Sequence, residues 1–211
     1  LAKLMVNKKR YYDREAVMKD MDLIQQACSD EGYAYADVVP RTVPQDKEQT
    51  VDVIYQVTKG NQVYFNRINI IGNTKTRDKV IRRLLTVVEG DLYSKTNLKN
   101  SYMAINRLRY FEEVDFQTEK GADANSTRVN IRVREKPTGM FSIGAGYSAL
   151  DNAIFTAQIG QQNLFGRGQS LSLKANISSR SMNYELSFIE PWLFDMPLWT
   201  KTDIWKMYRD Y

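Results

Sequence analysis

The sequence predicts two copies of an α+β module followed by the antiparallel strands of an incomplete transmembrane β-barrel. Three observations lead to this fold class. Apolar positions repeat at a spacing of 78 residues within residues 1–137, each copy ends in two strands of alternating polarity, and the hydrophobic period becomes two after Gly139. Helices repeat their faces every 3.6 residues and strands every 2, so the change of period near Pro137 and Gly139 marks a domain boundary.

The repeat aligns apolar side chains with apolar side chains. A shift of 78 residues holds without a gap from residue 33 to residue 57, and it aligns Tyr33 with Phe111, Val38 with Phe116, Val51 with Val129, Val53 with Ile131 and Tyr55 with Val133. Self-similarity on this scale predicts two domains of the same fold.

The first copy, residues 1–60, predicts one helix and two strands. The helix is expected to begin after the N-cap Asp13 and to end at Gly32. Its apolar face recurs at helical spacing through Val17, Met21, Ile24 and Cys28. Strands are expected over 34–43 and 50–59, the second with one buried face. A domain with only these elements is expected to lack its front part.

The second copy, residues 61–137, predicts a complete module. The expected elements are a strand over 63–71, a helix over 77–88, a helix capped by Ser94, and strands over 113–119 and 127–136. The first helix is expected to turn inward Val80, Ile81, Leu84, Leu85 and Val88, and the second Leu98, Tyr102, Ile105 and Leu108. The order β-α-α-β-β buries these stripes when two helices cover one face of a three-stranded sheet.

Residues 138–211 predict the first four to five strands of the barrel. Segments of about ten residues alternate apolar and small polar side chains, a length that crosses a bilayer at a tilt. Aromatic residues gather near the segment ends, as in an interfacial girdle. A soluble antiparallel sheet has the same period, and it predicts instead that helices cover the side of Leu171, Leu173 and Ile177.

The composition argues against catalysis. The chain has 211 residues, no histidine and one cysteine, so the commonest general base is absent and no intrachain disulfide or thiolate zinc cage can form. The acids of the first helix have no partner base and are expected on its surface: Asp13, Asp20, Asp22, Asp30 and Glu31. Cys28 is expected to be a buried small apolar side chain. We expect no enzyme, no cofactor and no metal.

The net charge of +5 lies before residue 138, because the later residues carry six basic and six acidic side chains. The pI near 9.1 permits nucleic-acid binding, but aromatic and basic residues are not interleaved, so none is expected. The sequence has no run of ~18 apolar residues, so no transmembrane helix is expected. It has no leader at its start, and any signal peptide is expected outside it.

Five stretches resemble the outer-membrane β-barrel assembly superfamily. Residues 67–74 resemble the opening strand and turn of a POTRA domain, and residues 106–114 resemble its helix-to-strand junction. The other stretches resemble the junction to the barrel and the following hairpins: 135–148, 163–171 and 190–193. The superfamily's Arg-Gly-Phe motif is absent, since Gln169 follows Arg167-Gly168, but that motif belongs to a late barrel loop that four or five strands do not reach.

The resemblance implies a protein of the bacterial outer membrane with its POTRA domains in the periplasm. It implies assembly and insertion of β-barrel proteins there, by capture of unfolded clients at strand edges and transfer to the first barrel strand. The implied partners are unfolded outer-membrane β-barrel proteins, accessory lipoproteins of the assembly complex and outer-membrane lipid, with no nucleic acid. The alternative is a two-partner-secretion or TamA-like transporter of the same superfamily.

The resemblance also assigns three sites. The POTRA client edge is the second strand of the complete copy, with Val114, Asp115, Phe116, Gln117 and Thr118, and the strand at 34–43 in the first copy. The first barrel strand, which forms a lateral gate, holds Phe141, Ser142, Ile143, Gly144, Ala145, Gly146 and Tyr147. The resemblance places the accessory-lipoprotein contact at Glu89 and Gly90, although the residues themselves favour a glutamate beside a helix-ending glycine.

Two features keep alternative readings. The glycines of the first barrel strand either weaken an edge that opens or allow barrel curvature. A basic run can meet lipid head groups or an acidic partner, or it can be a solvated helix face: Lys75, Arg77, Lys79, Arg82 and Arg83.

Overall fold

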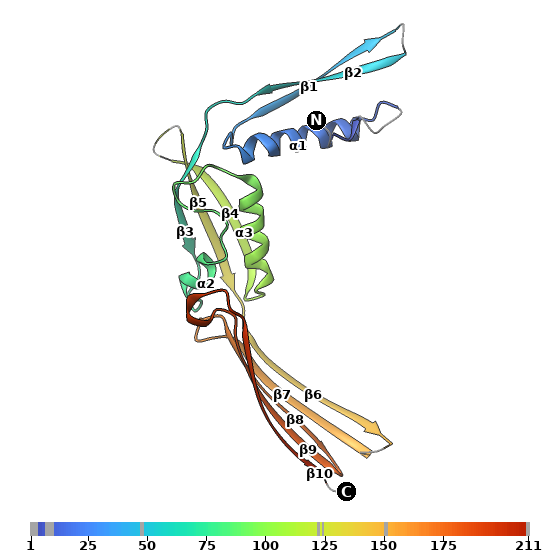
Figure 1. Ribbon diagram of the computed structural model, residues 1–211, viewed down its shortest axis with the longest axis vertical. Coiled ribbons are helices and arrows are strands. Elements are labelled where there is room, and N and C mark those ends of the chain that lie inside the picture. Colours follow the sequence, from blue (N-terminus) through green and yellow to red (C-terminus); the bar gives the residue numbers. More distant parts are fainter. Residues whose placement is uncertain are drawn as a thin grey trace. The chain divides into compact units, whose positions relative to one another are not determined.

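The computed structural model describes residues 4–6, 11–46, 49–121, 123, 125–149 and 152–209. Figure 1 shows its elements in chain order: α1 (Arg14–Asp30), β1 (Asp37–Gln45), β2 (Thr50–Thr58), β3 (Tyr64–Ile71), α2 (Asp78–Arg82), α3 (Lys95–Arg107), β4 (Phe111–Lys120), β5 (Ser126–Glu135), β6 (Gly139–Ser148), β7 (Asn152–Leu164), β8 (Gln169–Ser178), β9 (Ser181–Glu190), the 3₁₀ helix η2 (Leu193–Asp195) and β10 (Thr200–Arg209). Two compact units are present. One comprises Leu1–Ile71, Leu85–Ile105 and Asp115–Arg132, and the other comprises Gly72–Leu84, Asn106–Val114 and Val133–Tyr211.

The first copy folds as one helix and a two-stranded hairpin. The carboxylate of Asp13 accepts hydrogen bonds from the backbone N–H groups of Glu15 and Ala16, which confirms the predicted N-cap of α1. β1 and β2 pair antiparallel in one register from end to end. The predicted buried face of β2 is only half-buried, at Val53 and Tyr55, while the other side chains of the strand are exposed.

Asp20 corrects the expectation that the acids of α1 all lie on its surface. Its side chain is fully buried, and its carboxylate accepts hydrogen bonds from the backbone N–H groups of Met5 and Val6. The hydroxyl of Tyr55 also donates to it, at 3.4 Å. Burial and the neighbouring Asp20 carboxylate raise the pKa of Tyr55 to about 12. Three donors satisfy this buried acid, so its role here is structural.

The second copy has the predicted order β-α-α-β-β. Its three strands form one sheet in the order β3-β5-β4, in which β3 runs parallel to β5. The hydroxyl of Ser94 accepts a hydrogen bond from the backbone N–H of Asn97, which caps α3 as expected. The alternating burial of β5 leaves Val129, Ile131 and Val133 inside, as its period predicts.

The helix expected over 77–88 is wrong in length, because α2 ends at Arg82. Thr86 explains the early end. Its backbone N–H donates to the hydroxyl of Ser101, and its own hydroxyl donates to the carbonyl of Asn97, so these groups bond to α3 instead of continuing a helix. Val87 is therefore buried, and Val88, which was expected to face inward, is 59% exposed.

The last five strands form one antiparallel sheet in the order β10-β9-β8-β7-β6 (Figure 1). Each strand pairs with its neighbour in sequence, so the sheet is a simple meander. This agrees with the four to five strands that the alternation predicted. Among the described residues, no helix is long and apolar enough to cross a membrane.

The C-terminal end of α1 bonds to the N-terminal end of α3. The carboxylate of Asp30 accepts hydrogen bonds from the Ser94 hydroxyl (2.8 Å), the Thr96 backbone N–H (2.9 Å) and the Thr96 hydroxyl (2.6 Å). Gln26 adds a fourth bond to the Thr96 hydroxyl. Burial acts to raise the pKa of Asp30, but the bonds from Thr96 and Ser94, with the charge of Lys95, outweigh it and hold the pKa below its ordinary value.

The β7–β8 turn is bonded to the loop between β3 and α2. The buried amide of Asn163 donates to the Thr76 hydroxyl (2.8 Å) and accepts from the Gly168 backbone N–H (2.9 Å). The backbone N–H of Arg77 donates to the Gly166 carbonyl (2.9 Å). A Cβ at Gly166 would lie 1.9 Å from the Lys75 carbonyl oxygen, and φ is +70° there, so only glycine fits.

Glu135, at the end of β5, completes this contact. Its carboxylate accepts hydrogen bonds from the Thr74 hydroxyl and from the backbone N–H groups of Lys75 and Thr76. These bonds outweigh the effect of burial and hold the pKa of Glu135 below its ordinary value. We call this set of residues, 73–77, Glu135 and 163–168, the loop-turn contact.

We predict that Asp30→Ala loosens the start of α3. It removes three hydrogen bonds to a charged acceptor, and because the carboxylate is largely exposed we expect a loss of about 1–2 kcal/mol of local stability. Hydrogen exchange of the Thr96 and Asn97 amides in the full-length protein measures it. Since the folded pKa is depressed, the wild-type contribution is present above the unfolded pKa and is lost as pH falls below it. Asp22→Ala, on the exposed side of α1, is the control and leaves exchange at α3 unchanged.

We predict that Asn163→Ala destabilises the loop-turn contact. It removes the bond to the buried Thr76 hydroxyl and leaves the Gly168 N–H without its side-chain acceptor, at a cost of about 1–3 kcal/mol. Urea unfolding of the full-length protein, followed by tryptophan fluorescence, measures the change. Asn152→Ala is a matched control, because Asn152 also has a positive φ but makes only an exposed bond to Ser179. Equal losses for the two variants would contradict the role of the buried amide.

Candidate functional site

The first strand of the sheet has an open edge. In the part of the chain that the structure describes, β6 pairs with β7 along its whole length and with no strand on its other side. The seven residues assigned to a gate all lie on this edge: Phe141, Ser142, Ile143, Gly144, Ala145, Gly146 and Tyr147. All seven are exposed. Backbone groups on the outer side of such a strand are free to pair with an added strand.

The glycines of this edge are not required by packing. A Cβ built at Gly144 or Gly146 meets no atom within 4 Å, and neither residue has a positive φ. They face Thr156 and Ile154 across the β6–β7 pair. Glycine at these positions removes cross-strand side-chain contacts without relieving any clash, so the pairing of β6 is weaker than that of a strand with full side chains.

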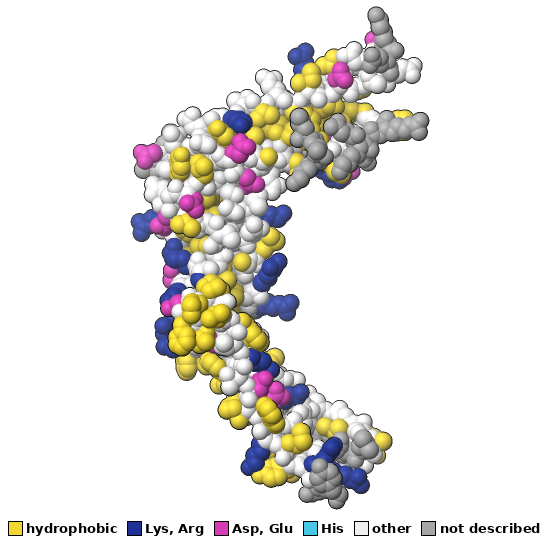
Figure 2. Space-filling view, viewed as in Figure 1, with side chains coloured by type: hydrophobic (Ala, Val, Ile, Leu, Met, Phe, Trp, Pro, Cys, Tyr) yellow, Lys and Arg dark blue, Asp and Glu magenta, His cyan; other side chains and the backbone are white. Residues whose placement is uncertain are grey.

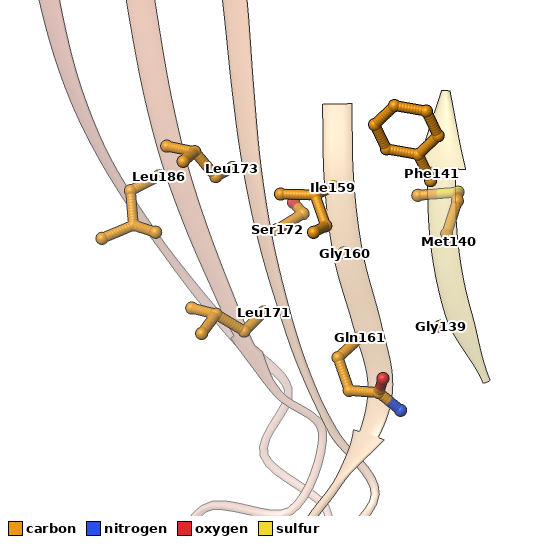
Figure 3. Close-up of a pocket in the computed structure, with 10 residues that line it drawn as sticks. All are labelled: Gly139, Met140, Phe141, Ile159, Gly160, Gln161, Leu171, Ser172, Leu173 and Leu186. Atoms are coloured by element: carbon orange, nitrogen blue, oxygen red, sulfur yellow. The ribbon is translucent and has the colours of Figure 1, made fainter. Parts of the chain in front are cut away.

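One face of the sheet is apolar and uncovered. The strand register aligns a row of five large side chains across it: Phe141, Ile159, Leu173, Leu186 and Ile204. They are 72%, 58%, 46%, 39% and 64% exposed. Figure 3 shows four of them around a shallow depression of about 590 Å³, with Gln161 at one end. The most exposed of these side chains belong to the outer strands, because an outer strand has a neighbour on one side only.

The exposure of this face decides between the two readings of the sheet. Leu171, Leu173 and Ile177 are 36%, 46% and 38% exposed, so the expectation that helices cover them in a soluble sheet is wrong for the described residues. Burying each such side chain fully is worth about 1.5–3 kcal/mol. A continuous row of apolar side chains that stays exposed to water loses this stabilisation. Such a row indicates a face that contacts lipid or a partner protein.

The opposite face carries more charge than its small polar residues suggested. Its rows include Ser142, Gln158, Lys174 and Glu185 in register. Lys174 and Glu185 sit opposite each other, so their charges compensate across β8 and β9. In β10 the apolar Trp205 falls in the same row and is 69% exposed.

A second open edge belongs to the sheet of the second copy. The order β3-β5-β4 places β4 at an edge, and β4 holds Val114, Asp115, Phe116, Gln117 and Thr118. Phe116 packs edge-on against Tyr102 with ring centroids 5.8 Å apart. Gln117 and Thr118 are exposed. Packing therefore holds the middle of the strand, while its later half presents free surface.

Glu89 and Gly90 bond to β3, the strand at the other edge of this sheet. The Glu89 carboxylate accepts a hydrogen bond from the backbone N–H of Ile68 (2.9 Å), next to an irregularity in the β3–β5 pairing after Phe65. The backbone N–H of Gly90 donates to the Phe65 carbonyl (2.7 Å), and its φ is +95°. One Glu89 oxygen thus supports β3, yet the side chain stays exposed.

Among the residues that the structure describes, the side chains with ligating chemistry are not brought together. Cys28 is buried and unpaired, as its place on the apolar stripe predicted. Within the described ranges, no group of three or more acidic, cysteine or histidine side chains could hold a metal ion. Sequence reasoning missed the loop-turn contact, and no local signal reveals it, because Thr76 and Asn163 are 87 residues apart.

Comparison with known proteins accounts for both parts of the chain. The POTRA family, described as a surface antigen variable number repeat, matches residues 1–60 and 63–136, and the Omp85 superfamily domain matches residues 163–207. The outer membrane protein assembly factor BamA of Nitratidesulfovibrio vulgaris is 32% identical over 182 residues, which are 86% of this chain and 23% of that protein. BamA of Neisseria meningitidis serogroup B is 32% identical over 194 residues, 91% of this chain and 24% of that protein.

A solved structure shows the same fold. BamA from Haemophilus ducreyi lacking POTRA domains 1–3 superimposes with a TM-score of 0.86 at 24% identity, over 94% of this chain and 38% of that one. It confirms the predicted fold class, POTRA-like repeats followed by antiparallel strands that start a barrel.

The chain spans about a quarter of the length of the curated relatives that it matches. Those relatives are named outer membrane protein assembly factors, which agrees with the predicted localisation in the outer membrane. Two repeat matches cover well over half of the residues. The chain therefore belongs to the POTRA family, and a match to the Omp85 superfamily domain follows its repeats in the sequence.

Proposed function

We propose that the protein of which this chain is a part assembles and inserts β-barrel proteins into the bacterial outer membrane. The observation that carries the proposal is strand β6, which among the described residues pairs only with β7, carries two glycines that no neighbouring atom requires, and lies at the margin of an exposed apolar sheet face. The names of the relatives, outer membrane protein assembly factors, support the same activity. Residues 1–60, 61–137 and 138–211 are the proposed periplasmic domains and start of the barrel.

Backbone hydrogen bonding supplies the driving force at this edge. In water a strand that pairs with β6 gains about 0.5–1.5 kcal/mol per bond, because it gives up bonds to water. In the hydrocarbon region an unpaired backbone group costs several kcal/mol, so pairing there is far more favourable. An edge at the lipid boundary therefore attracts client strands by their backbone, whatever their side chains.

The periplasmic step uses the other edge. The exposed half of β4, at Gln117 and Thr118, adds an unfolded client strand before it reaches β6. Glu89 and Gly90 form the proposed contact for an accessory lipoprotein, because the Glu89 side chain stays exposed while it supports β3. Outer-membrane lipid contacts the apolar row from Phe141 to Ile204.

Depletion of the full-length protein in its own cells tests the activity. We expect the folded, heat-modifiable forms of many outer-membrane β-barrel proteins to fall together, because every such client uses the same edge. The secretion alternative predicts a different result, in which one secreted partner is lost while resident barrel proteins keep their levels. Quantitative proteomics of isolated outer membranes distinguishes the two.

Photo-crosslinking tests the mechanism at the edge. A benzoylphenylalanine at Phe141, on β6, is expected to crosslink to a stalled client barrel protein in cells. The matched control is the same replacement at Phe155, which is also aromatic and exposed on the same face, but lies one strand further in.

The yield at Phe141 is expected to exceed that at Phe155 by about tenfold or more, since only Phe141 borders an added strand. Equal yields at the two positions would mean that clients lie over the sheet face and do not add to its edge, and the mechanism would be wrong.

A further inference from the structure

A charged cavity lies at the end of the sheet where β7 turns into β8 and β9 ends. It has a volume of about 330 Å³ and borders α2, the β7–β8 turn and η2. Its charged lining residues are Arg77, Lys79, Arg83, Arg167, Glu190 and Asp195. Four cations against two carboxylates leave the lining with an excess of two positive charges.

The two carboxylates already have partners. Asp195 forms an ion pair with Lys79 at 2.6 Å. Glu190 accepts hydrogen bonds from the Gln169 side-chain amide and from the backbone N–H of Trp192. The Asp195 charge is paired with Lys79, and the Glu190 carboxylate acts on Arg83 through its charge. The two carboxylates offset two of the four cations, so the lining keeps an excess of two positive charges.

The three arginines are the unsatisfied groups. The guanidinium groups of Arg77 and Arg167 form no hydrogen bond or ion pair with any described residue, and both side chains are exposed. The Nε–H of Arg83 is buried and has no hydrogen-bond partner among the described residues. The Arg83 guanidinium lies over the Trp192 ring, 4.9 Å from the ring centre, a cation–π contact.

Burial lowers the pKa of Arg83, although a guanidinium stays protonated in any accessible pH range. A half-buried permanent cation with an unmet donor is costly until an anion accepts from it. A guanidinium can donate two parallel hydrogen bonds to two oxygens of one phosphate, which the ammonium group of lysine cannot do. The chemistry of the cavity therefore suits a phosphate group.

Exposed aromatic and apolar side chains surround this charge. Phe194 lines the cavity and is 81% exposed, and Phe165 and Trp199, on the adjoining turns, are 79% and 63% exposed. Figure 2 shows apolar side chains gathered around these turns, beside basic ones. Aromatic side chains in this setting mark the level of the lipid headgroups, where phosphates lie next to acyl chains.

We propose that this cavity binds the phosphate of an anionic phospholipid headgroup, with Arg77, Arg83 and Arg167 as its donors and Phe194 against the adjoining acyl chain. The proposal goes beyond client assembly and rests only on the placement of β6–β10 in the membrane. A lipid phosphate held here would accept hydrogen bonds from the arginines that flank α2 and from Arg167 in the β7–β8 turn, so it would join these two segments in addition to the loop-turn contact. The sequence analysis proposed the basic run that includes Arg77 and Arg83 as a contact for lipid head groups. Arg167 and the Trp192 ring come next to these arginines only in the folded chain.

Native mass spectrometry of the full-length protein in detergent tests the site. The probes are palmitoyl-oleoyl phosphatidylglycerol, phosphatidylcholine with the same chains, and inorganic phosphate. We expect the wild type to retain phosphatidylglycerol in preference to phosphatidylcholine. Each arginine near a headgroup contributes roughly 1 kcal/mol, so Arg77→Gln and Arg167→Gln should each weaken phosphatidylglycerol binding by about fivefold.

The double variant Arg77→Gln/Arg167→Gln should weaken binding by about 25-fold without unfolding the protein, because both side chains are exposed. Arg83→Gln tests the buried donor separately. Arg180→Gln is the matched control, an exposed arginine in the turn at the opposite end of the same sheet, and it should leave binding unchanged.

Three results would overturn the proposal: equal retention of phosphatidylcholine, unchanged affinity in the double variant, or displacement of the lipid by 10 mM inorganic phosphate, a concentration chosen on the order of ten times a millimolar Kd. The last result would assign the cavity to a free phosphate. Outer-membrane proteomics of the same variants measures client assembly independently of lipid binding. If only the lipid proposal is wrong, lipid retention fails the test while the depletion experiment still lowers the barrel proteins; if the assembly function is wrong, the depletion experiment itself leaves them unchanged.

Discussion

The buried bond between Asn163 and Thr76 is the interaction on which the second unit depends. It joins a turn of the sheet to the loop before α2, and Glu135 fixes that loop from the end of β5 by accepting three hydrogen bonds. Because Thr76 and Asn163 are both buried, neither can replace the bond with water. The position of Arg77 and Arg83 beside the β7–β8 turn follows from this contact, and so does the cavity that they line.

The sheet itself satisfies two opposed requirements. Within the described residues its inner strands are paired on both sides, whereas β6 and β10 are paired on one side only, and β6 has two glycines that no neighbouring atom requires. An edge of this kind is a hazard in a soluble protein, because it invites aggregation. In a protein that receives strands, the same unmet hydrogen bonds are the means of recognition. The cost of an unpaired backbone in lipid, several kcal/mol per group, makes the membrane the place where that recognition is strongest.

Hydrogen bonds from backbone N–H groups and short polar side chains also connect the two copies. Asp30 receives three hydrogen bonds at the start of α3, and its depressed pKa shows that they favour the charged form. Asp20 performs a comparable task inside the first copy, where it holds the segment around Met5 and Val6. Acids that sequence reasoning treated as surface charge are thus used to hold segments together. Their carboxylates accept from backbone donors, so they need no basic partner that a sequence pattern would reveal.

The sequence by itself determined the elements and their order. The 78-residue repeat, the caps at Asp13 and Ser94, and the period of two after Gly139 each depend on residues close together in the chain, so they could be read without the fold. Tertiary structure decided the rest. It ended α2 at Arg82, left the Leu173 face uncovered, and brought Thr76 to Asn163 and Arg83 to Trp192. These outcomes depend on contacts across dozens of residues, and burial and hydrogen bonding at such distances are set only when the whole chain has folded.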